Sequence, residues 1–271
     1  MEKQLVELRE ELLKQSKPLI ATAQPITVET KEIPIWLGQY RLKQGQTLKM
    51  PYFYNRHCLS DSAYFGDWDC LITRHLATGK EAYNQNWINA SQIMKTDDCR
   101  EPSGFTPLHQ AAYYGASKLV VEKLILLGAW KLARTVRNGL MQTPLDIAKQ
   151  YGWAHLYSLL VPVVHHPLPA SILLGLQSQL CEVFAMAFPS TKNWFQVPQV
   201  EILTELKDPH LWVPLEAEKQ VDRPIGIHLF LDERELVAQA VKLDGTAKIY
   251  RIREDGWVEI ERGMLFYYQR G

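Results

Sequence analysis

The sequence predicts an α+β protein in which a short helical solenoid of about three repeats is followed by a helix and an antiparallel β-meander. Two observations predict this class. A Thr-Pro-Leu motif recurs in the middle of the chain, each time followed by small residues, a glycine and apolar residues. The last third has short apolar runs separated by turn-forming dipeptides such as Asp-Gly. The expected domains are an N-terminal helix and extended segment over 1–54, the repeats over 55–163, a linker and helix over 164–196, and an antiparallel β domain over 197–271.

The N-terminal segment begins with a predicted amphipathic helix. Residues 2–16 place leucines at helical spacing with charged residues between them, at Leu5, Leu8, Leu12 and Leu13. A helix this short is marginally stable alone, so we expect it to pack onto the first repeat; a helix that binds a partner is the alternative. Residues 17–56 contain prolines among aromatic and β-branched residues, which predicts extended chain with one short hairpin.

The clearest repeat is GFTPLHQAAYYGASKLVVEKLILLGA, residues 104–129. Thr106 is a preferred helix cap, and Pro107 suits the first helical position. Two alanines then let a neighbouring helix approach closely, and Gly115 fits a tight turn. The apolar residues that follow the glycine form a face for the next repeat.

This stretch closely resembles the ankyrin repeat, whose signature is T-P-L-H-x-A at a period of about 33 residues. The resemblance implies that each repeat is a pair of short helices and that neighbouring pairs stack side by side. It also implies a structural role for His109, which stands at the family's histidine position. Its imidazole is expected to hydrogen-bond to backbone groups between repeats.

Two further copies are predicted, because one repeat cannot bury its own apolar face. The downstream copy starts at Thr143-Pro144 and keeps an alanine and a glycine at the matching positions. The upstream copy is degraded, with His57-Cys58 in place of the Thr-Pro start, and is expected to cap the stack. Its matching residues are Leu59, Ala63, Gly66, Leu71, Ile72, His75, Leu76 and Gly79.

The connection between the upstream and middle copies, residues 80–103, is longer than most loops in compact domains. Loops of such length are usually functional or mobile. This one contains Trp87, Ile88 and Ile93, which predict that it folds back against the body of the protein.

After the repeats, the sequence predicts a helix and then a sheet. Ser171 is a candidate cap for a helix over 171–188, whose apolar face comprises Leu173, Leu176, Leu180, Val183 and Phe184. From about residue 197, the runs IHLFL, ELVAQAVKL, TAKIYRIR and WVEIE end at Asp232-Glu233, Asp244-Gly245, Asp255-Gly256 and Arg262-Gly263. Such runs predict an antiparallel meander packed on this helix.

Aromatic residues are the candidate partner-binding residues. The two residues before each repeat's glycine are Tyr64-Phe65, Tyr113-Tyr114 and Gln150-Tyr151. The ankyrin resemblance implies that these positions end the first helix of each repeat and face a concave groove used for partners. Stacked repeats would align Phe65, Tyr114 and Tyr151 as a ladder, with Tyr64, Tyr113 and Phe105 beside it. Aromatic side chains are enriched in interface hot spots; the alternative is that the rings pack beneath the 80–103 loop or the N-terminal segment.

No catalytic residue, metal ligand or cofactor is predicted. The chain has no GxSxG, P-loop, GxGxxG or HExxH motif. Four residues of the degraded repeat come closest to a zinc-binding set: His57, Cys58, Cys70 and His75. They fall at helix-start and packing positions, so we interpret them as core side chains and not as ligands. His165 and His166, in a proline-bounded linker, are interpreted as exposed.

The predicted β domain carries several carboxylates: Asp232, Glu233, Glu235, Asp255, Glu259 and Glu261. Most fall at turns or on the outward side of alternating strands, where charged residues are common. An acid–base pair among them stays open as an alternative, because sequence spacing does not reveal which side chains converge across a sheet.

The composition argues against several partner classes. The 30 basic and 30 acidic residues balance, which argues against a nucleic-acid partner. No stretch reaches the roughly 18 consecutive apolar residues of a membrane span, and the charged N-terminus lacks the apolar core of a signal peptide. The 4 cysteines form no CxxC pair and predict free, mostly buried thiols. We therefore expect no membrane partner and a cytoplasmic location.

These observations favour a non-enzymatic protein–protein interaction module that binds a protein partner through the concave face of the repeats. The ankyrin resemblance also permits a more specific role, an inhibitor of a bacterial toxin or effector. The alternative from another class is that the C-terminal domain is an enzyme or binds a small ligand, and that the repeats dock it. A rigid scaffold that assembles into an oligomer is a third hypothesis.

Overall fold

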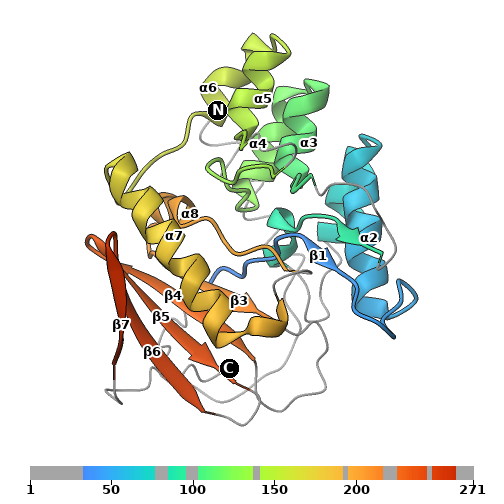
Figure 1. The fold of residues 1–271 in the computed structure, drawn as a ribbon. Helices are drawn as coiled ribbons and strands as arrows, with labels where there is room; N and C mark the ends of the chain where they lie inside the picture. The colour runs from blue at the N-terminus through green and yellow to red at the C-terminus, as the bar shows by residue number, and fades with distance from the viewer. Residues whose placement is uncertain are drawn as a thin grey trace, which may run out of the picture.

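The computed structural model describes residues 33–76, 85–95, 103–136, 141–191, 195–215, 225–242 and 246–260. The predicted helix over 2–16 and Glu261 lie outside these residues. Within them the α+β prediction is confirmed: short helices fill the middle of the chain, and an antiparallel sheet of five strands follows (Figure 1).

The sheet is a simple meander, as predicted. Its strands are β3 (His210–Pro214), β4 (Gly226–Asp232), β5 (Glu235–Val241), β6 (Ala247–Arg253) and β7 (Gly256–Ile260). They lie in chain order, and each pairs antiparallel with the next. The turn between β4 and β5 places Glu233 at φ 51°, and Asp255-Gly256 carries the chain from β6 into β7. The turn signals in the sequence therefore located these hairpins.

Helix α7 (Ala170–Ala187) covers one face of the sheet (Figure 1). The alternation along β5 turns Leu236, Ala238 and Ala240 toward it, and all three are fully buried. The buried positions of the helix are Ile172, Leu176, Leu180, Val183, Phe184 and Ala187. By length and composition alone α7 could cross a membrane, and a third of its residues are buried inside the protein.

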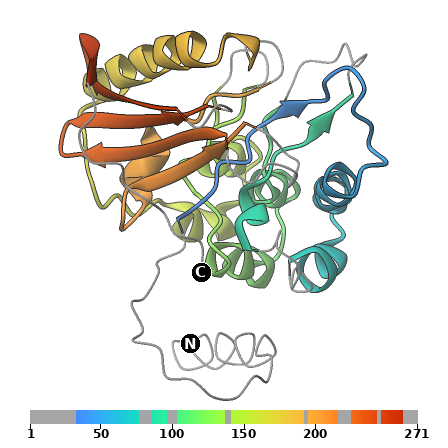
Figure 2. The same ribbon diagram turned by 90° about the horizontal axis from the view of Figure 1, so that it is seen from below.

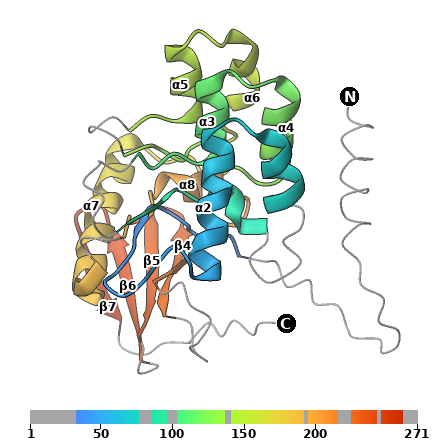
Figure 3. The same ribbon diagram turned by 90° about the vertical axis from the view of Figure 1, so that its right-hand side faces the viewer.

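The helical half consists of short helices in pairs. The elements are α2 (Pro51–Tyr64) with η1 (Cys70–Leu76), α3 (Pro107–Tyr114) with α4 (Lys118–Leu126), and α5 (Pro144–Gln150) with η4 (Ala154–Leu156) and α6 (Tyr157–Leu160). Helix α2 packs beside α3, α3 beside α5, and α4 beside α6 (Figure 3). The first helices of the pairs therefore form one row, and the second helices form another. A shared apolar core lies between the two rows.

The predicted helix starts and turns of the last two pairs are confirmed. Thr106 caps α3 and Thr143 caps α5, each followed by proline at the first helical position. The glycines Gly66, Gly115 and Gly152 end the first helices with φ of 71°, 60° and 75°, in the left-handed region that glycine adopts without strain.

The start of the first pair differs from the prediction. Helix α2 begins at Pro51, after the N-cap Met50, so His57 and Cys58 lie in its middle. Pro51 fits the first helical position, where its missing N–H costs no hydrogen bond. The helix has 14 residues, compared with 8 in α3. The extra turns lie before the stretch that matches the other pairs.

The connection over 80–103 folds back, as predicted, in its described part. It forms η2 (Gln85–Asn89) and β2 (Ile93–Met94), with Trp87, Ile88 and Ile93 buried. The Asn89 side chain donates to the carbonyl of Gly128 at 2.9 Å and accepts from the N–H of Trp130 at 2.8 Å. This connection therefore supports the chain that leaves α4.

The segment before α2 joins the two halves of the protein. Strand β1 (Tyr40–Arg41) pairs parallel with β2, and Figure 2 shows both strands between the sheet and α2. Ile35 forms a parallel bridge to Trp212 of β3. Trp36 stacks on Trp130, with ring centroids 6.1 Å apart, inside the core that contains α7 and the sheet.

A group of polar contacts fixes α8 (Glu201–Glu205) against the chain that follows α4. The Glu205 carboxylate accepts from the backbone N–H groups of Lys131 and Leu132 at 2.8–3.0 Å. Arg134 donates to both carboxylate oxygens of Glu201 at 2.6 and 3.0 Å. The helical half and the sheet are therefore connected by ordered hydrogen bonds as well as by apolar packing.

Candidate functional site

Five exposed aromatic residues lie where the first helices of the pairs end, and Phe105, which precedes α3, packs against one of them, Tyr113. We call this set the aromatic surface: Tyr64, Phe65, Phe105, Tyr113, Tyr114 and Tyr151. Five of the six are exposed, with fractions from 40% for Tyr113 to 74% for Phe65, and Phe105 is half-buried. Such large apolar side chains are usually buried, so a contiguous exposed group marks a candidate interaction site.

The fold places these rings by ending three helices at the same level. Tyr64 is the last residue of α2, Tyr114 the last of α3, and Tyr151 directly follows α5. Each helix then stops at the left-handed glycine described above, so the rings project where the chain turns. Because α2, α3 and α5 pack side by side, the three ends lie next to one another.

The rings contact one another across the helix pairs. Tyr113 and Tyr151 lie edge to face with centroids 4.9 Å apart, and Tyr113 and Tyr114 do so at 5.3 Å. Tyr64 and Phe65 form a third edge-to-face pair at 5.2 Å. The Tyr114 hydroxyl donates to the backbone carbonyl of Tyr64, which links the first two pairs. Edge-to-face pairs of this kind stabilise a ring arrangement by about 0.5–1.5 kcal/mol beyond area burial.

The contacts differ from the predicted ladder of Phe65, Tyr114 and Tyr151 at both steps. Tyr151 packs against Tyr113, where the ladder placed Tyr114, and Tyr114 reaches Tyr64, where the ladder placed Phe65. Adjacent residues on a helix point about 100° apart, so only one of the two tyrosines can point along the row toward α5. The other, Tyr114, points toward α2 and reaches Tyr64. The two tyrosines of α3 therefore connect the surface in both directions.

Two tryptophans that were not predicted from the sequence support the surface. Trp68 packs edge to face against Tyr114 at 6.4 Å. Trp153 donates from its indole N–H to the carbonyl of Tyr113 at 3.2 Å, and a Cβ built at Gly115 would lie 2.4 Å from its ring. The signal was available, since each tryptophan closely follows a turn glycine in the sequence.

The remaining predicted residue, Gln150, lies at the exposed end of α5. Its side-chain oxygen accepts from the side-chain amide of Gln142 at 2.7 Å. Burial raises the pKa of Tyr114, with smaller contributions from the neighbouring Tyr64 and Tyr113. The Tyr114 hydroxyl therefore stays protonated at neutral pH and remains a hydrogen-bond donor.

His109 has the structural role that was expected for it. It is fully buried, and its Nε2 lies 3.0 Å from the carbonyl of Ala133 and 3.2 Å from that of Gln142. Both partners are acceptors, so Nε2 carries the proton, and Nδ1 accepts from the N–H and hydroxyl of Thr106 at 3.2 and 2.8 Å. Burial lowers the pKa of His109 from 6.5 to about 4. The neutral ring therefore connects the α3 cap to the chain that enters α5.

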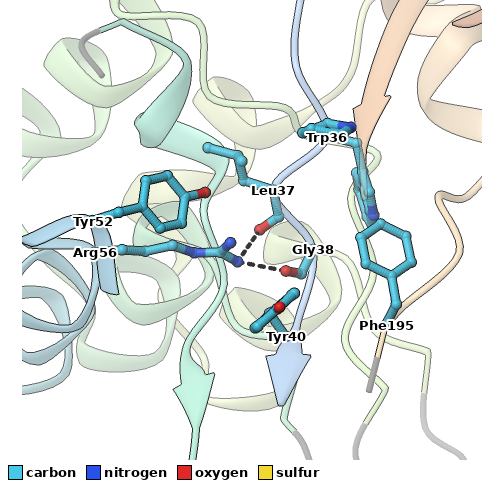
Figure 4. A pocket seen from close by; sticks show the side chains of 8 residues that line it. Trp36, Leu37, Gly38, Tyr40, Tyr52, Arg56 and Phe195 are labelled. Carbon is cyan, nitrogen blue, oxygen red and sulfur yellow. Dashed lines mark hydrogen bonds between the residues drawn. The ribbon is translucent and has the colours of Figure 1, made fainter. Parts of the chain in front are cut away.

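A small cavity lies where the segment before α2 meets the sheet (Figure 4). It encloses about 10 Å³, room for about one water molecule. The Arg56 guanidinium lies beside it and donates to the carbonyls of Leu37, Gly38 and Ser91. The guanidinium is thus occupied in holding β1 and β2, and the cavity is too small for a substrate.

Three carboxylates of the alternative catalytic set, Asp232, Glu235 and Glu259, form ion pairs on the sheet. Glu235 lies 3.1 Å from Arg251 and 2.6 Å from Arg253, and Glu259 lies 2.8 Å from Lys248. A second hollow, of about 620 Å³, lies at the junction of the two halves. The second hollow is lined by Glu205, but neither hollow is lined by the described members of the alternative catalytic set: Asp232, Glu233, Glu235, Asp255 and Glu259.

Three of the four residues considered for zinc, His57, Cys58 and Cys70, have described side chains. Within the described part of the chain, no group of three or more His, Cys, Asp or Glu residues is arranged to hold a metal ion. His57 instead pairs with Asp61 at 3.3 Å. The cysteines Cys58 and Cys70 are half-buried and Cys181 is exposed, so the prediction of mostly buried thiols is wrong for these three, although none of them forms a disulfide bond. The side chain of His75 and all of Cys99 lie outside the described residues.

Comparison with protein-family models, curated proteins and solved structures finds no match to this chain. The geometry of its own residues is therefore the basis for a functional proposal. Of the features described above, the aromatic surface is the one that combines exposure, apolar area and a defined arrangement.

Proposed function

We propose that the protein is a non-enzymatic interaction module, and that it binds a protein partner through the aromatic surface. The observation that carries this proposal is the contact of exposed rings across the helix pairs, above all Tyr113 with Tyr151 at 4.9 Å and Tyr114 with the Tyr64 carbonyl. The exposed faces of these rings place apolar area in contact with water, which is unfavourable. A bound partner would cover this area and remove it from water.

We further propose that the helix pairs are ankyrin-type repeats. Supporting this, the positions aligned in the sequence have the same local structure. Gly66, Gly115 and Gly152 are all left-handed, and the alanines at the aligned helix position, Ala63, Ala112 and Ala148, are all buried. On this proposal the aromatic surface lies along the concave side of a short stack whose first unit is the cap.

The chemistry of the surface suits a folded or extended polypeptide. Tyrosine offers a large apolar ring, a hydroxyl that can donate or accept, and few rotatable bonds to immobilise. The contacts among the rings restrict them further before binding, which lowers the entropic cost of association. A bacterial toxin or effector that this protein inhibits is the specific partner that the ankyrin resemblance suggests.

The proposal is tested by capture of the partner with the whole chain. Tagged wild-type protein is incubated with lysate from its source cells, and bound proteins are identified by mass spectrometry. The double variant Tyr114→Ala with Tyr151→Ala should lose the specific partner. The control Leu119→Ala with Leu174→Ala, two exposed leucines on α4 and α7 (59% and 72%), should keep it. Equal capture by both variants would contradict the proposal.

A further inference from the structure

Two histidines lie next to each other on the face of the sheet that is turned away from α7. His210 belongs to β3 and His228 to β4. His210 lies opposite Phe230 in the strand register, two residues along from His228, so the two histidines are diagonal neighbours on one face. Leu211 and Leu229 alternate with them and point into the core that contains α7. The histidine pair lines neither hollow and is not part of the aromatic surface.

The two imidazole rings bring a nitrogen of each close together. Nδ1 of His210 lies 3.1 Å from Nε2 of His228. Two imidazole nitrogens on one tetrahedral Zn²⁺ ion, at Zn–N distances of about 2.0–2.1 Å, are about 3.3 Å apart. The observed separation is close to that value, so a modest rotation of the rings is enough to direct both lone pairs at one ion.

A carboxylate fixes the tautomer of His210. Oδ1 of Asp208 lies 3.3 Å from Nε2, the other nitrogen of the same ring. Because an ionised carboxylate only accepts hydrogen bonds, Nε2 carries the proton and Nδ1 presents its lone pair toward His228. Metal-binding histidines almost always donate their second N–H to a carboxylate, a carbonyl or water, which orients the ring and raises its basicity as a ligand. Asp208 therefore has the place of such an orienting group and is not itself a ligand.

Ring stacking holds the pair together before any ion arrives. His210 stacks on Phe230 with ring centroids 4.4 Å apart and on His228 with centroids 5.1 Å apart. His228 is buried, with 8% of its surface exposed, whereas 23% of the His210 side chain is exposed. Solvent therefore approaches the pair from the His210 side. Ligands that are already close to their bound positions lose little conformational entropy on binding.

The donor atoms determine the class of ion. Imidazole nitrogens suit Zn²⁺, Cu²⁺ and Ni²⁺, whereas Mg²⁺ and Ca²⁺ prefer oxygen ligands. In the described part of the chain, no third His, Cys, Asp or Glu residue converges with the pair to form a metal-binding group. A closed structural zinc site has four protein ligands, so this pair would form an open site whose remaining positions are taken by water.

We propose that His210 and His228 together bind one divalent transition-metal ion such as Zn²⁺, with Asp208 as the positioning residue. The ion takes the place of the proton between the two rings and is bound by Nδ1 of His210 and Nε2 of His228. Nε2 of His228 releases its proton to water, and Nδ1 of the same ring takes one up, so both imidazoles stay neutral. The bound ion connects β3 to β4 through side chains.

Isothermal titration calorimetry with zinc chloride tests this proposal on the untagged, chelator-treated whole chain. Wild type should bind one equivalent of Zn²⁺, and magnesium chloride should give no binding heat. His210→Gln should abolish this binding, because one imidazole remains. The matched control is His165→Gln with His166→Gln, which removes a second histidine pair in the linker before α7 and should bind zinc as wild type does.

Asp208 acts through His210, so its variants should change the zinc affinity and not the fold. Asp208→Ala should weaken zinc binding roughly 10- to 100-fold, the range typical of an orienting group. Asp208→Asn keeps a side-chain oxygen that accepts from Nε2 and should recover part of this loss. With a chelator present, both variants should melt within about 2 °C of wild type, because the Asp208 side chain is 47% exposed.

Pulsed electron paramagnetic resonance with Cu²⁺ in place of Zn²⁺ counts the imidazoles on the ion. We expect two in wild type and one or none in His210→Gln. Fewer than two in wild type would overturn the proposal, and this result does not depend on the folding of any variant. Absence of saturable zinc binding by wild type would also overturn it. So would full zinc affinity in His210→Gln, which would place the ion elsewhere, at His165 and His166 if their variant loses it.

Discussion

Tyr113 and Tyr151 lie edge to face with ring centroids 4.9 Å apart, although they belong to different helix pairs. Both are more than a third exposed, so the contact does not bury either ring. It aligns two tyrosines at a protein surface and leaves their outer faces available. This contact defines the centre of the aromatic surface, and the predictions below concern the structure that holds it.

Replacing Gly115 with alanine should displace Trp153, which supports the aromatic surface. The left-handed φ of 60° penalises any side chain there by about 1–2 kcal/mol, and the new Cβ would lie 2.4 Å from the Trp153 ring. Trp153 would have to move and lose its hydrogen bond to the Tyr113 carbonyl. We expect Gly115→Ala to lower the free energy of unfolding by about 3 kcal/mol in urea titrations.

Gly152→Ala is the control for this substitution. Gly152 ends α5 with φ 75°, but no atom lies within 4 Å of a Cβ built there. Gly152→Ala should therefore lower the free energy of unfolding only by the backbone penalty of about 1–2 kcal/mol. Equal costs for the two variants would show that Trp153 does not press on Gly115.

His109 should make the stability of the protein depend on pH. Its pKa is about 4 in the folded protein and 6.5 in the unfolded chain, because burial disfavours the charged ring. Between these values the unfolded chain binds more protons, so stability is complete above about pH 6.5 and falls as the pH is lowered toward about 4. The full loss is about 3 kcal/mol.

His109→Gln removes this dependence while keeping a neutral polar side chain. We expect urea titrations between about pH 7 and about pH 4.5 to show a shallower fall in stability for the variant than for wild type. Some slope should remain, because burial also lowers the pKa of His228 to about 4. Parallel curves for the two proteins would mean that His109 is not buried as a neutral ring.

Glu205 should be essential for holding the two halves together. Its carboxylate accepts from two backbone N–H groups, and Glu205→Ala would leave both without this acceptor. We expect a loss of about 2–4 kcal/mol in the free energy of unfolding. Glu205→Gln keeps one side-chain oxygen as an acceptor and should cost less than half as much. If the alanine variant melts like wild type, solvent reaches these N–H groups and the contact is not structural.

Much of the fold could be predicted from local sequence signals. Thr106 and Thr143 cap helices, Asp255-Gly256 joins two strands, and the apolar face of α7 packs on the sheet. Each of these depends on neighbours within a few residues or on a regular period, which is what a sequence pattern encodes. The positions of the exposed rings follow from the same signals, because the rings precede the turn glycines.

The remaining features depend on contacts between distant residues. The start of α2 at Pro51 was hidden, because the repeat match begins several residues later and the prolines before it suggested extended chain. The bonds from Glu205 to Lys131 and from Arg134 to Glu201 join segments more than 60 residues apart. Which of Tyr113 and Tyr114 meets Tyr151 depends on the rotation of α3 relative to α5, and no spacing along the chain reveals it.

The affinity of the captured partner for variants of the aromatic surface tests the central claim most directly. By isothermal titration calorimetry, Tyr114→Ala with Tyr151→Ala should weaken binding by at least about 30-fold, the loss of about 2 kcal/mol typical of a hot spot. Tyr114→Phe, which keeps the ring and loses only the hydrogen bond to Tyr64, should bind within about threefold of wild type. Unchanged affinity in the double alanine variant, with wild-type folding, would contradict the proposal that the partner binds at the aromatic surface.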